Sequence, residues 1–249
     1  MIDYLIVYFQ FFTVIPIPVE INQSGDKLKK AVPYFPLFAS LYSLLLVGIF
    51  CLLRLFLTDW TAATLCLGMD ILLTRGFHYD ALADTADGLF SSRSPDRMLA
   101  IMKDSTIGAN GTLALILYFL LAVHLGDHLV QSRMEVHLLS FVWAWFFVGR
   151  SLLPITFYRL TYVGLNPHGL GSLFTQVASW RIFLSQVLAS VILASQSLTL
   201  LAAYGGAVLF ALGYRRFVIA RIGGMTGDTM GALVLLGQVI FALVLGGMV

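Results

Sequence analysis

The sequence is poor in charge, and this lack narrows the class of protein. Only 11% of its 249 residues are Asp, Glu, Lys or Arg, whereas soluble domains usually carry about 25%. Hydrophobic residues make up 59% of the chain, and its mean hydropathy is +0.90. The net charge of +2 is too small to indicate a protein that binds nucleic acid. The composition therefore predicts a protein that crosses a membrane several times.

Cysteine is scarce too, and the signs of an exported protein are missing. Cys51 and Cys66 both lie in apolar segments, so nothing indicates an oxidising compartment or a disulfide framework. The opening residues, MIDYLIVYFQFFTVIPIP, lack the basic start and the small-residue cleavage site of a secretory signal peptide. We therefore expect no removable signal. No repeat or low-complexity tract divides the chain, which predicts a single transmembrane domain over residues 1–249.

Apolar stretches of about 20 residues, the length that crosses a bilayer, recur along the chain. We expect an all-α polytopic membrane bundle of about seven transmembrane helices. An N-terminal interfacial helix at 2–15 should precede them and end at Pro16, which cannot continue a helix. The segment 19–33 that follows is expected to be a polar loop. The expected spans are 34–57, 60–75, 108–127, 137–158, 181–202, 204–220 and 229–248.

Lysine and arginine gather on one side of these spans. The alternation of spans brings 19–33, 76–107, 159–180 and 214–228 to one face, and the other face holds little beyond Arg133. Because Lys and Arg in short loops favour the cytoplasmic side, we expect the first face and the N-terminus to lie in the cytoplasm, below the inner membrane. The twelve basic residues in or beside these segments are Lys27, Lys29, Lys30, Arg75, Arg93, Arg97, Lys103, Arg159, Arg181, Arg215, Arg216 and Arg221.

The stretch GFHYDALADTADG places four ionisable groups, His78, Asp80, Asp84 and Asp87, within ten residues. The spacing of the aspartates, i, i+4 and i+7, puts them on one face of a helix. Three carboxylates on one face repel each other unless a cation lies between them. Mg²⁺ prefers such hard oxygen ligands and commonly binds through a few carboxylates and substrate phosphates. We therefore predict a Mg²⁺ site here, with His78 close enough to join it.

A solvated acidic helix face is the alternative to a metal site. Such a face would usually include Lys, Glu or Gln, and none of these occurs between residues 76 and 92. Downstream, Arg93, Arg97 and Lys103 are available to bind phosphates, although ordinary interfacial positive charges are the alternative for each. The segment 96–104 is expected to form a short amphipathic helix after Ser-Pro, a good helix start.

Three further segments should lie on the same face. In GGMTGDTMGA, Thr226 and Asp228 stand among glycines, which suits a ligand or metal site but also suits helix capping by Asp228. The turn IGANG, which contains Asn110, leads back into the membrane. The turn-rich loop 164–174 is a candidate lid over a substrate.

Two charged residues fall inside the expected spans. Arg150 lies in an apolar span and therefore needs an acidic or a phosphate partner. We favour a role for Arg150 in substrate binding. Asp70 is expected either to pair with an arginine or to take part directly in function.

Taken together, these motifs resemble the cobalamin synthase family, the adenosylcobinamide-GDP ribazoletransferases. The likeness covers nearly the whole chain and includes FFTVIPIP, PYFPL, GFHYDALADTADGLFSSRSPDRMLAIMKDSTIGANG, GLG and GGMTGDTMGA. The resemblance implies an inner-membrane enzyme of cobalamin biosynthesis with Mg²⁺ as cofactor. It would transfer the adenosylcobinamide phosphate moiety from adenosylcobinamide-GDP to α-ribazole or its 5′-phosphate and release GMP.

The resemblance also implies roles for the residues singled out above. A metal would neutralise the diphosphate and the leaving GMP, and an aspartate without metal, or His78, would take the hydroxyl proton. A homo-oligomer is left open. The candidate site residues are, as catalytic groups, Asp84, Asp87, His78 and Arg93; as substrate-binding groups, Arg93, Arg97, Lys103, Arg150, Asn110 and Thr226; and as metal ligands, Asp80, Asp84, Asp87 and Asp228.

Two rival functions compete with this interpretation. DTADGLFSSR is similar to the start of the CDP-alcohol phosphotransferase motif, D-x-x-D-G-x-x-A-R, but has one extra residue before the arginine. Such an enzyme would act on a lipid and release CMP. A metal-coupled or proton-coupled transporter would instead spread its carboxylates at mid-bilayer over several spans. Here the carboxylates gather at one mouth of the bundle.

Overall fold

The structure, a computed structural model, describes residues 1–131 and 138–248, except for the side chains of residues 126–131. Arg133, the basic residue expected on the opposite face, lies outside the described residues. The α-helices are α1 (Ile2–Phe12), α2 (Ser24–Lys30), α3 (Phe35–Leu53), α4 (Asp59–Thr74), α5 (Phe77–Leu89), α6 (Pro95–Ile101), α7 (Ala109–Gln131), α8 (Leu138–Leu152), α9 (Ser179–Gln196), α10 (Leu198–Ile222) and α11 (Gly227–Gly246). The short 3₁₀ helices are η1 (Val32–Tyr34), η2 (Leu153–Phe157) and η3 (Leu170–Phe174).

Each of the seven expected spans is a helix, which confirms the all-α membrane bundle. Four helical stretches are long and apolar enough to cross a membrane by length and composition: Val32–Leu53, Leu138–Phe157, Leu198–Ile222 and Gly227–Gly246. Shorter or less apolar helices, α4, α7 and α9, correspond to the other three expected spans. The chain is thus a multi-pass membrane protein.

Several expectations about the helices are wrong. Helix α1 ends at Phe12 and not at Pro16, because Thr13 already takes an extended backbone conformation. The break between the fifth and sixth spans lies at Ser197 instead of near residue 203, because the Ser197 side chain accepts a hydrogen bond from the Thr199 amide at 3.1 Å and so begins α10. The segment 19–33 is not a loop throughout, contrary to expectation, because it contains helix α2. Its buried Leu28 offers a carbonyl oxygen to the Tyr8 hydroxyl at 3.0 Å, so packing against α1 stabilises it.

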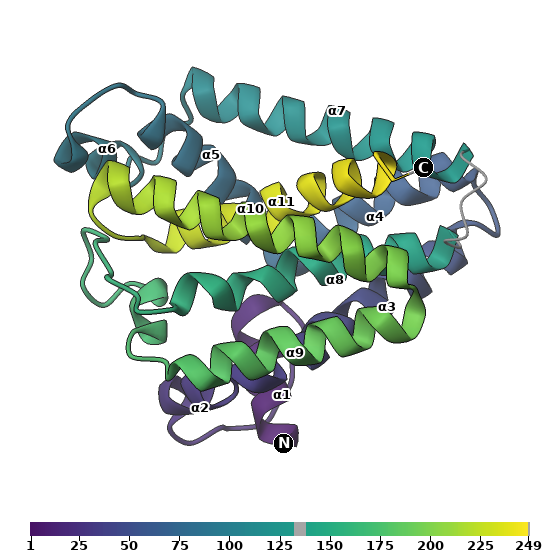
Figure 1. Ribbon diagram of the computed structural model, residues 1–249, viewed down its shortest axis with the longest axis horizontal. Coiled ribbons are helices and arrows are strands. Elements are labelled where there is room, and N and C mark those ends of the chain that lie inside the picture. Colours follow the sequence, from purple (N-terminus) through teal and green to yellow (C-terminus); the bar gives the residue numbers. More distant parts are fainter. Residues whose placement is uncertain (132–137, 249) are drawn as a thin grey trace.

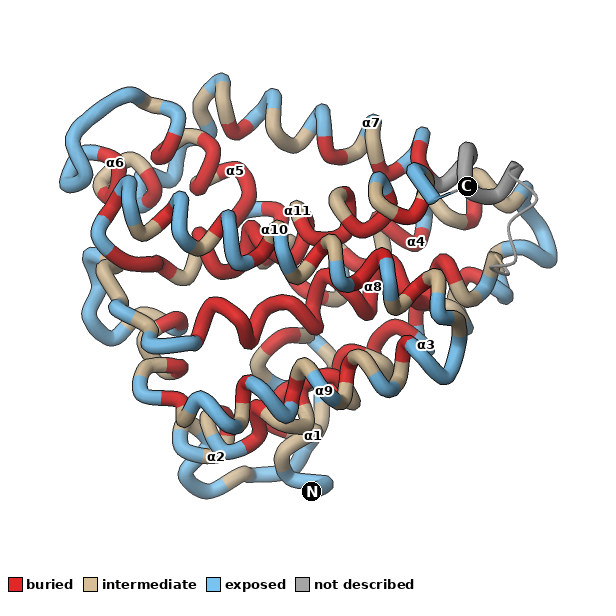
Figure 2. Tube along the Cα trace, in the orientation of Figure 1, coloured by how far each residue is buried: buried red, intermediate tan, exposed pale blue. Residues whose placement is uncertain are grey.

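Helix α11 forms the centre of the bundle and packs against α5, α7, α8 and α10. Figure 2 shows buried residues gathered along α8 and α11. Glycines allow the close approach: a Cβ on Gly149 would lie 2.4 Å from the Val234 carbonyl oxygen, and one on Gly231 would lie 2.7 Å from the Cβ of Ala81. Small residues serve the same purpose in membrane bundles generally.

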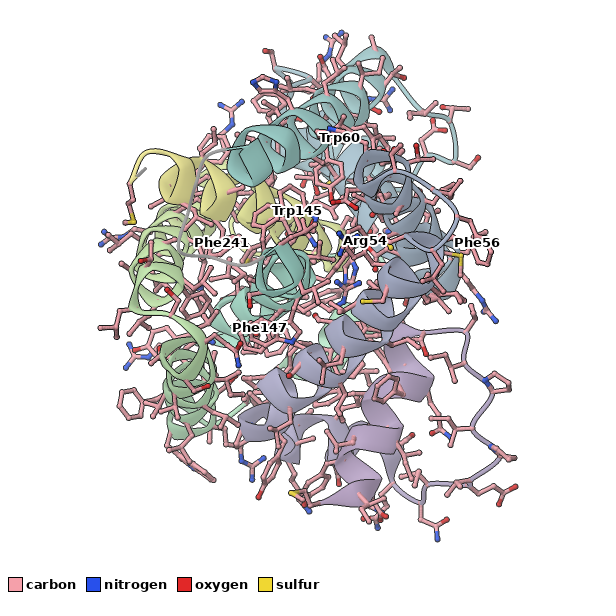
Figure 3. All side chains as sticks on the ribbon, turned by 90° about the vertical axis from the view of Figure 1, so that its right-hand side faces the viewer. Arg54, Phe56, Trp60, Trp145, Phe147 and Phe241 are labelled. Carbon is pink, nitrogen blue, oxygen red and sulfur yellow. The ribbon has the colours of Figure 1, made fainter. Side chains whose placement is uncertain are left out.

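The two ends of the bundle differ in content. One end gathers α6, the turn between α10 and α11, and the loop before α9 (Figure 1). The opposite end carries the α3–α4 turn, where Arg54 and Asp59 form an ion pair with a 2.6 Å N–O distance. Figure 3 views this end, with Phe56 at the edge of the bundle and Trp145 inside it. The segments that carry the acidic motifs all belong to the first end.

Candidate functional site

A cleft of about 910 Å³ opens beside α5. The end of α1 (residues 10–13), the α4–α5 junction (residues 74–77) and the segment after α6 (residues 102–107) line it, together with one face of α5. The lining mixes aromatic, hydroxyl and charged side chains. A cleft of this size and composition suits a large amphipathic anion better than a simple ion.

Helix α5 brings Asp80 and Asp84 to this cleft. The helix starts after Gly76, whose φ of +68° is a conformation that glycine adopts without strain. Its apolar side, which includes Leu82 and Leu89, is buried in the bundle. As a result the aspartates face outward: Asp80 is exposed and Asp84 is half-buried.

The four predicted metal ligands lie close enough for the other three carboxylates to raise the pKa of Asp84. Burial, followed by the negative charges of Asp80 and Asp228, raises the pKa of the Asp84 carboxyl to about 7. Asp87 contributes to the same shift and Lys103 opposes it. Within the described part of the chain, no group of three or more His, Cys, Asp or Glu side chains lies close enough together to hold a metal. Three carboxylates line the cleft: Asp80, Asp84 and Asp104, the last of which accepts hydrogen bonds from the amide and hydroxyl of Thr106 at 3.0 and 2.7 Å.

Asp87 faces a different way from its two predecessors. Its Oδ2 accepts a hydrogen bond from the Gly108 amide at 2.7 Å, and its Oδ1 accepts one from the Gly111 amide at 2.9 Å. A Cβ on either glycine would lie 2.4 Å from a carboxylate oxygen, so this contact requires glycine. Asp87 thus anchors the start of α7. Asn110, in the same turn, is half-buried and does not line the cleft.

At the start of α11, the helix cap is Thr226 and not Asp228. The Thr226 hydroxyl accepts a hydrogen bond from the Thr229 amide at 3.1 Å, and the Thr229 hydroxyl accepts one from the Thr226 amide at 2.9 Å. Thr226 is buried by this arrangement. Asp228 instead pairs with Lys103, whose Nζ lies 3.2 Å from its Oδ2. The capping explanation for Asp228 is therefore wrong, and its carboxylate lies beside a cleft residue.

The three basic residues downstream of the acidic stretch separate into two groups. Lys103 lines the cleft. Arg93 and Arg97 are exposed but do not line it. Arg97 belongs to α6, which begins at Pro95, one residue before the expected start at 96, and ends at Ile101, three residues before the expected end at 104.

His78 lies behind the cleft and not in it. The side chain is 1% exposed and packs against the rings of Phe12 and Phe77, at centroid distances of 6.2 and 5.4 Å. Neither ring nitrogen has a hydrogen-bond partner among the described residues. Burial, followed by the charge of Arg150, lowers the pKa of His78 to about 3. The imidazole is therefore neutral at physiological pH.

Arg150 has an acidic partner inside the bundle. It forms an ion pair with Asp70, and its guanidinium lies 4.0 Å from the ring centroid of Tyr42. Asp70 also accepts hydrogen bonds from the hydroxyls of Tyr42 at 2.6 Å and Tyr79 at 3.0 Å. Of the two partners that the sequence allowed, the structure shows the carboxylate. Tyr79 lines the cleft, so this network supports its floor without opening into it.

Several cleft residues were missed by the sequence reasoning. Arg75, Thr74 and Ser105 line the cleft, as do residues of α1, but no motif marks them. The sequence indicated Arg75 only as one of the basic residues that favour the cytoplasmic side. The loop 164–174 touches the cleft through Leu170, and the hydrogen bond from the Val163 amide to the Met225 carbonyl, at 3.1 Å, ties the preceding backbone to the start of α11.

Known proteins resemble the chain over nearly its full length. The model of the cobalamin-5-phosphate synthase family matches residues 4–246. An adenosylcobinamide-GDP ribazoletransferase from Listeria welshimeri is 44% identical over 246 residues, 97% of each chain. Proteins with the same name from Caldanaerobacter subterraneus, at 34% identity over 92% of each chain, and Klebsiella pneumoniae, at 33% over 94% of this chain and 96% of the relative, are also similar. No solved structure matches. The chain therefore belongs to the cobalamin-5-phosphate synthase family.

Proposed function

We propose that this protein is an adenosylcobinamide-GDP ribazoletransferase. It transfers the adenosylcobinamide phosphate moiety from adenosylcobinamide-GDP to α-ribazole or its 5′-phosphate, giving adenosylcobalamin or its phosphate and GMP. The observation that carries the proposal is the family match over residues 4–246, with relatives of that name at up to 44% identity. The large cleft with carboxylates and cations in its lining supports it.

We propose Mg²⁺ as the cofactor, held by Asp80 and Asp84. The donor set fits, because Mg²⁺ usually binds through one or two carboxylates and completes its shell with water and substrate phosphates. The raised pKa of Asp84, caused first by burial and then by Asp80 and Asp228, indicates a site that favours a positive charge. The bound ion would neutralise charge on the diphosphate. Asp228 adds to the negative field that would retain the ion.

The reaction needs a nucleophile, a leaving group and a proton acceptor. A ribose hydroxyl of the acceptor forms a bond to the phosphorus that carries cobinamide, the bond from that phosphorus to the GMP oxygen breaks, and the hydroxyl proton leaves. Lys103 lines the cleft and offers its ammonium to the phosphate oxygens. His78 is buried behind the cleft, so a cleft carboxylate would accept the proton, and Asp104 is the one that the proposal does not assign to Mg²⁺.

We propose that the protein lies in the inner membrane with the cleft facing the cytoplasm. The basic residues of the cleft end, among them Arg75, Arg93, Arg97 and Lys103, are exposed or line the cleft. Such a bias favours the cytoplasmic side in multi-pass proteins. A cytoplasmic cleft would also receive its nucleotide-activated substrate without transport.

A substrate comparison tests the function. Purified protein in lipid vesicles would be given adenosylcobinamide-GDP with α-ribazole, and separately a CDP-activated alcohol with a lipid acceptor, both with Mg²⁺. We expect GMP and a cobamide from the first mixture and no CMP from the second. CMP release alone would favour the CDP-alcohol phosphotransferase. Metal flux without any nucleotide turnover would favour the transporter.

A further inference from the structure

We infer that Arg75 binds a phosphate group of a substrate in the cleft. Arg75 is not among the candidate site residues that the sequence indicated. The inference rests on the proposed function and adds one substrate-binding residue to it. Arg75 ends α4 and is followed directly by Gly76 and α5. It is exposed and lines the same cleft as Asp80, Asp84 and Lys103.

The guanidinium of Arg75 is free to bind a ligand. It makes no ion pair, hydrogen bond or ring contact with any residue that the structure describes. Lys103, the other cation of the cleft lining, is already paired with Asp228. A guanidinium presents five N–H donors in a planar fork that matches two phosphate oxygens. Arg75 is therefore the cleft cation best suited to a phosphate.

Among the described residues, no carbonyl oxygen at the end of α4 accepts a hydrogen bond from the Arg75 side chain, so Arg75 does not cap this helix through its guanidinium. Its φ of +55° is left-handed, a conformation that costs an arginine steric energy and costs glycine none. Glycine is accordingly the residue that most often ends a helix in this way. The local fold would therefore be served better by glycine, and what arginine adds at this position is its charge in the cleft.

Arg159 supplies a matched comparison within the same chain. It is an arginine with a φ of +44°, also exposed, and it does not line the cleft. Its guanidinium lies 5.4 Å from the ring centroid of Tyr158. Replacing either arginine by glycine relieves the same kind of backbone strain, but only the change at Arg75 removes a charge from the cleft.

The test measures steady-state GMP release for Arg75→Gly, Arg75→Gln, Arg75→Lys and Arg159→Gly. Arg75→Gly and Arg75→Gln should raise KM about tenfold, the size of one lost charge-assisted hydrogen bond at a partly exposed site. The value of kcat should change little, because Arg75 binds substrate in the ground state too. Arg75→Lys should keep part of the affinity. Arg159→Gly should leave KM unchanged, and both glycine variants should unfold at or above the wild-type temperature.

Varying each substrate identifies which phosphate Arg75 binds. A raised KM for adenosylcobinamide-GDP assigns Arg75 to the diphosphate. A raised KM for α-ribazole 5′-phosphate, with that for α-ribazole unchanged, assigns it to the acceptor phosphate. In either case the KM that rises should depend less on salt in Arg75→Gln than in wild type. Unchanged KM values for Arg75→Gln with an active wild type would overturn this inference alone, whereas a wild type that releases no GMP would overturn it together with the proposed function.

Discussion

Two ion pairs of this protein, one inside the bundle and one at the cleft, each join a carboxylate to a basic side chain but differ in how far they are buried. The side chains of Arg150 and Asp70 are 2% and 1% exposed, and two tyrosine hydroxyls complete the hydrogen bonding of the carboxylate. The side chains of Lys103 and Asp228 are 45% and 16% exposed, at a longer N–O distance of 3.2 Å. Burial and these hydrogen bonds keep Arg150 and Asp70 paired, whereas Lys103 and Asp228 are accessible enough to exchange each other for a ligand. Burial and the two tyrosine hydrogen bonds to the Asp70 carboxylate, more than charge itself, distinguish the structural pair from the pair available for function.

Breaking the buried pair should have the largest effect on stability. Asp70→Asn leaves the Arg150 cation uncompensated inside the bundle, which should cost about 3–5 kcal/mol of unfolding free energy. The thermal unfolding midpoint of the detergent-solubilised protein measures this. Lys103→Met breaks the exposed pair and is the matched control, with an expected cost below about 1 kcal/mol. Equal losses for both variants would contradict the distinction between the pairs. The double variant Asp70→Asn with Arg150→Met should recover part of the lost stability, because it removes the uncompensated cation and keeps an amide oxygen as an acceptor for a tyrosine hydroxyl.

Removing a cleft carboxylate should act on activity and not on stability. Asp84→Asn keeps the size of the side chain but loses the charge proposed to hold Mg²⁺, so GMP release should fall by about 100-fold or more, as for other essential catalytic groups. The variant should unfold at or above the wild-type temperature, because repulsion from Asp80 and Asp228 is relieved. Asp96→Asn, at an exposed position outside the cleft, should behave as wild type. Normal turnover by Asp84→Asn would remove this residue from the proposed site.

Asp87→Asn should combine a loss of activity with a loss of stability. A carboxamide oxygen can accept a hydrogen bond from Gly108 or Gly111 but its NH₂ group cannot accept the other, so one amide loses its partner. Such a loss costs about 1–3 kcal/mol when the group is buried. Hydrogen exchange of the two glycine amides, together with the unfolding midpoint, reports on this anchor. If Asp87→Asn were as stable as Asp84→Asn, Asp87 would not anchor α7.

The smallest effect we expect is a pH dependence that arises from Asp84. Its pKa is raised from 3.8 to about 7, by burial first and by Asp80 next. Between these values the folded protein binds more protons than the unfolded chain, so stability without Mg²⁺ should decrease as pH rises from about 4 to about 7. Mg²⁺ competes with the proton, and its apparent affinity should therefore rise over the same range. Unfolding midpoints with EDTA and with Mg²⁺ measure both trends, and Asp84→Asn should flatten them. A slope that survives in Asp84→Asn would assign the effect to another group.

Hydropathy predicted most of the fold but little of its detail. Long apolar runs located the seven segments, and the spacing of Asp80 and Asp84 predicted the face that meets the cleft. The break at Ser197 was missed because the apolar run continues beyond it, although a serine cap is a local signal that could have been used. Helix α2 was missed because its stability comes from burying Leu28 against α1, a contact between distant segments.

The site was predicted in part, for a similar reason. Sequence spacing groups Asp80, Asp84 and Asp87 together, yet the structure directs Asp87 to the amides of α7 and leaves the other two in the cleft. Thr226 and Asp228 are both preferred capping residues, and the sequence alone does not decide which of them caps α11. These outcomes depend on which helix packs beside which, and that information is spread over the whole chain.

The first helix has a practical consequence for anyone who purifies this protein. The last residues of α1 form a wall of the cleft, and the 11 residues of that helix separate the cleft from the N-terminus by only about 16 Å. A bulky affinity tag placed before Met1 would lie close to the entrance of the cleft and would sterically hinder a large substrate. Helix α11 ends at Gly246 at the opposite end of the bundle (Figure 1), and a tag attached after this helix would leave the entrance clear.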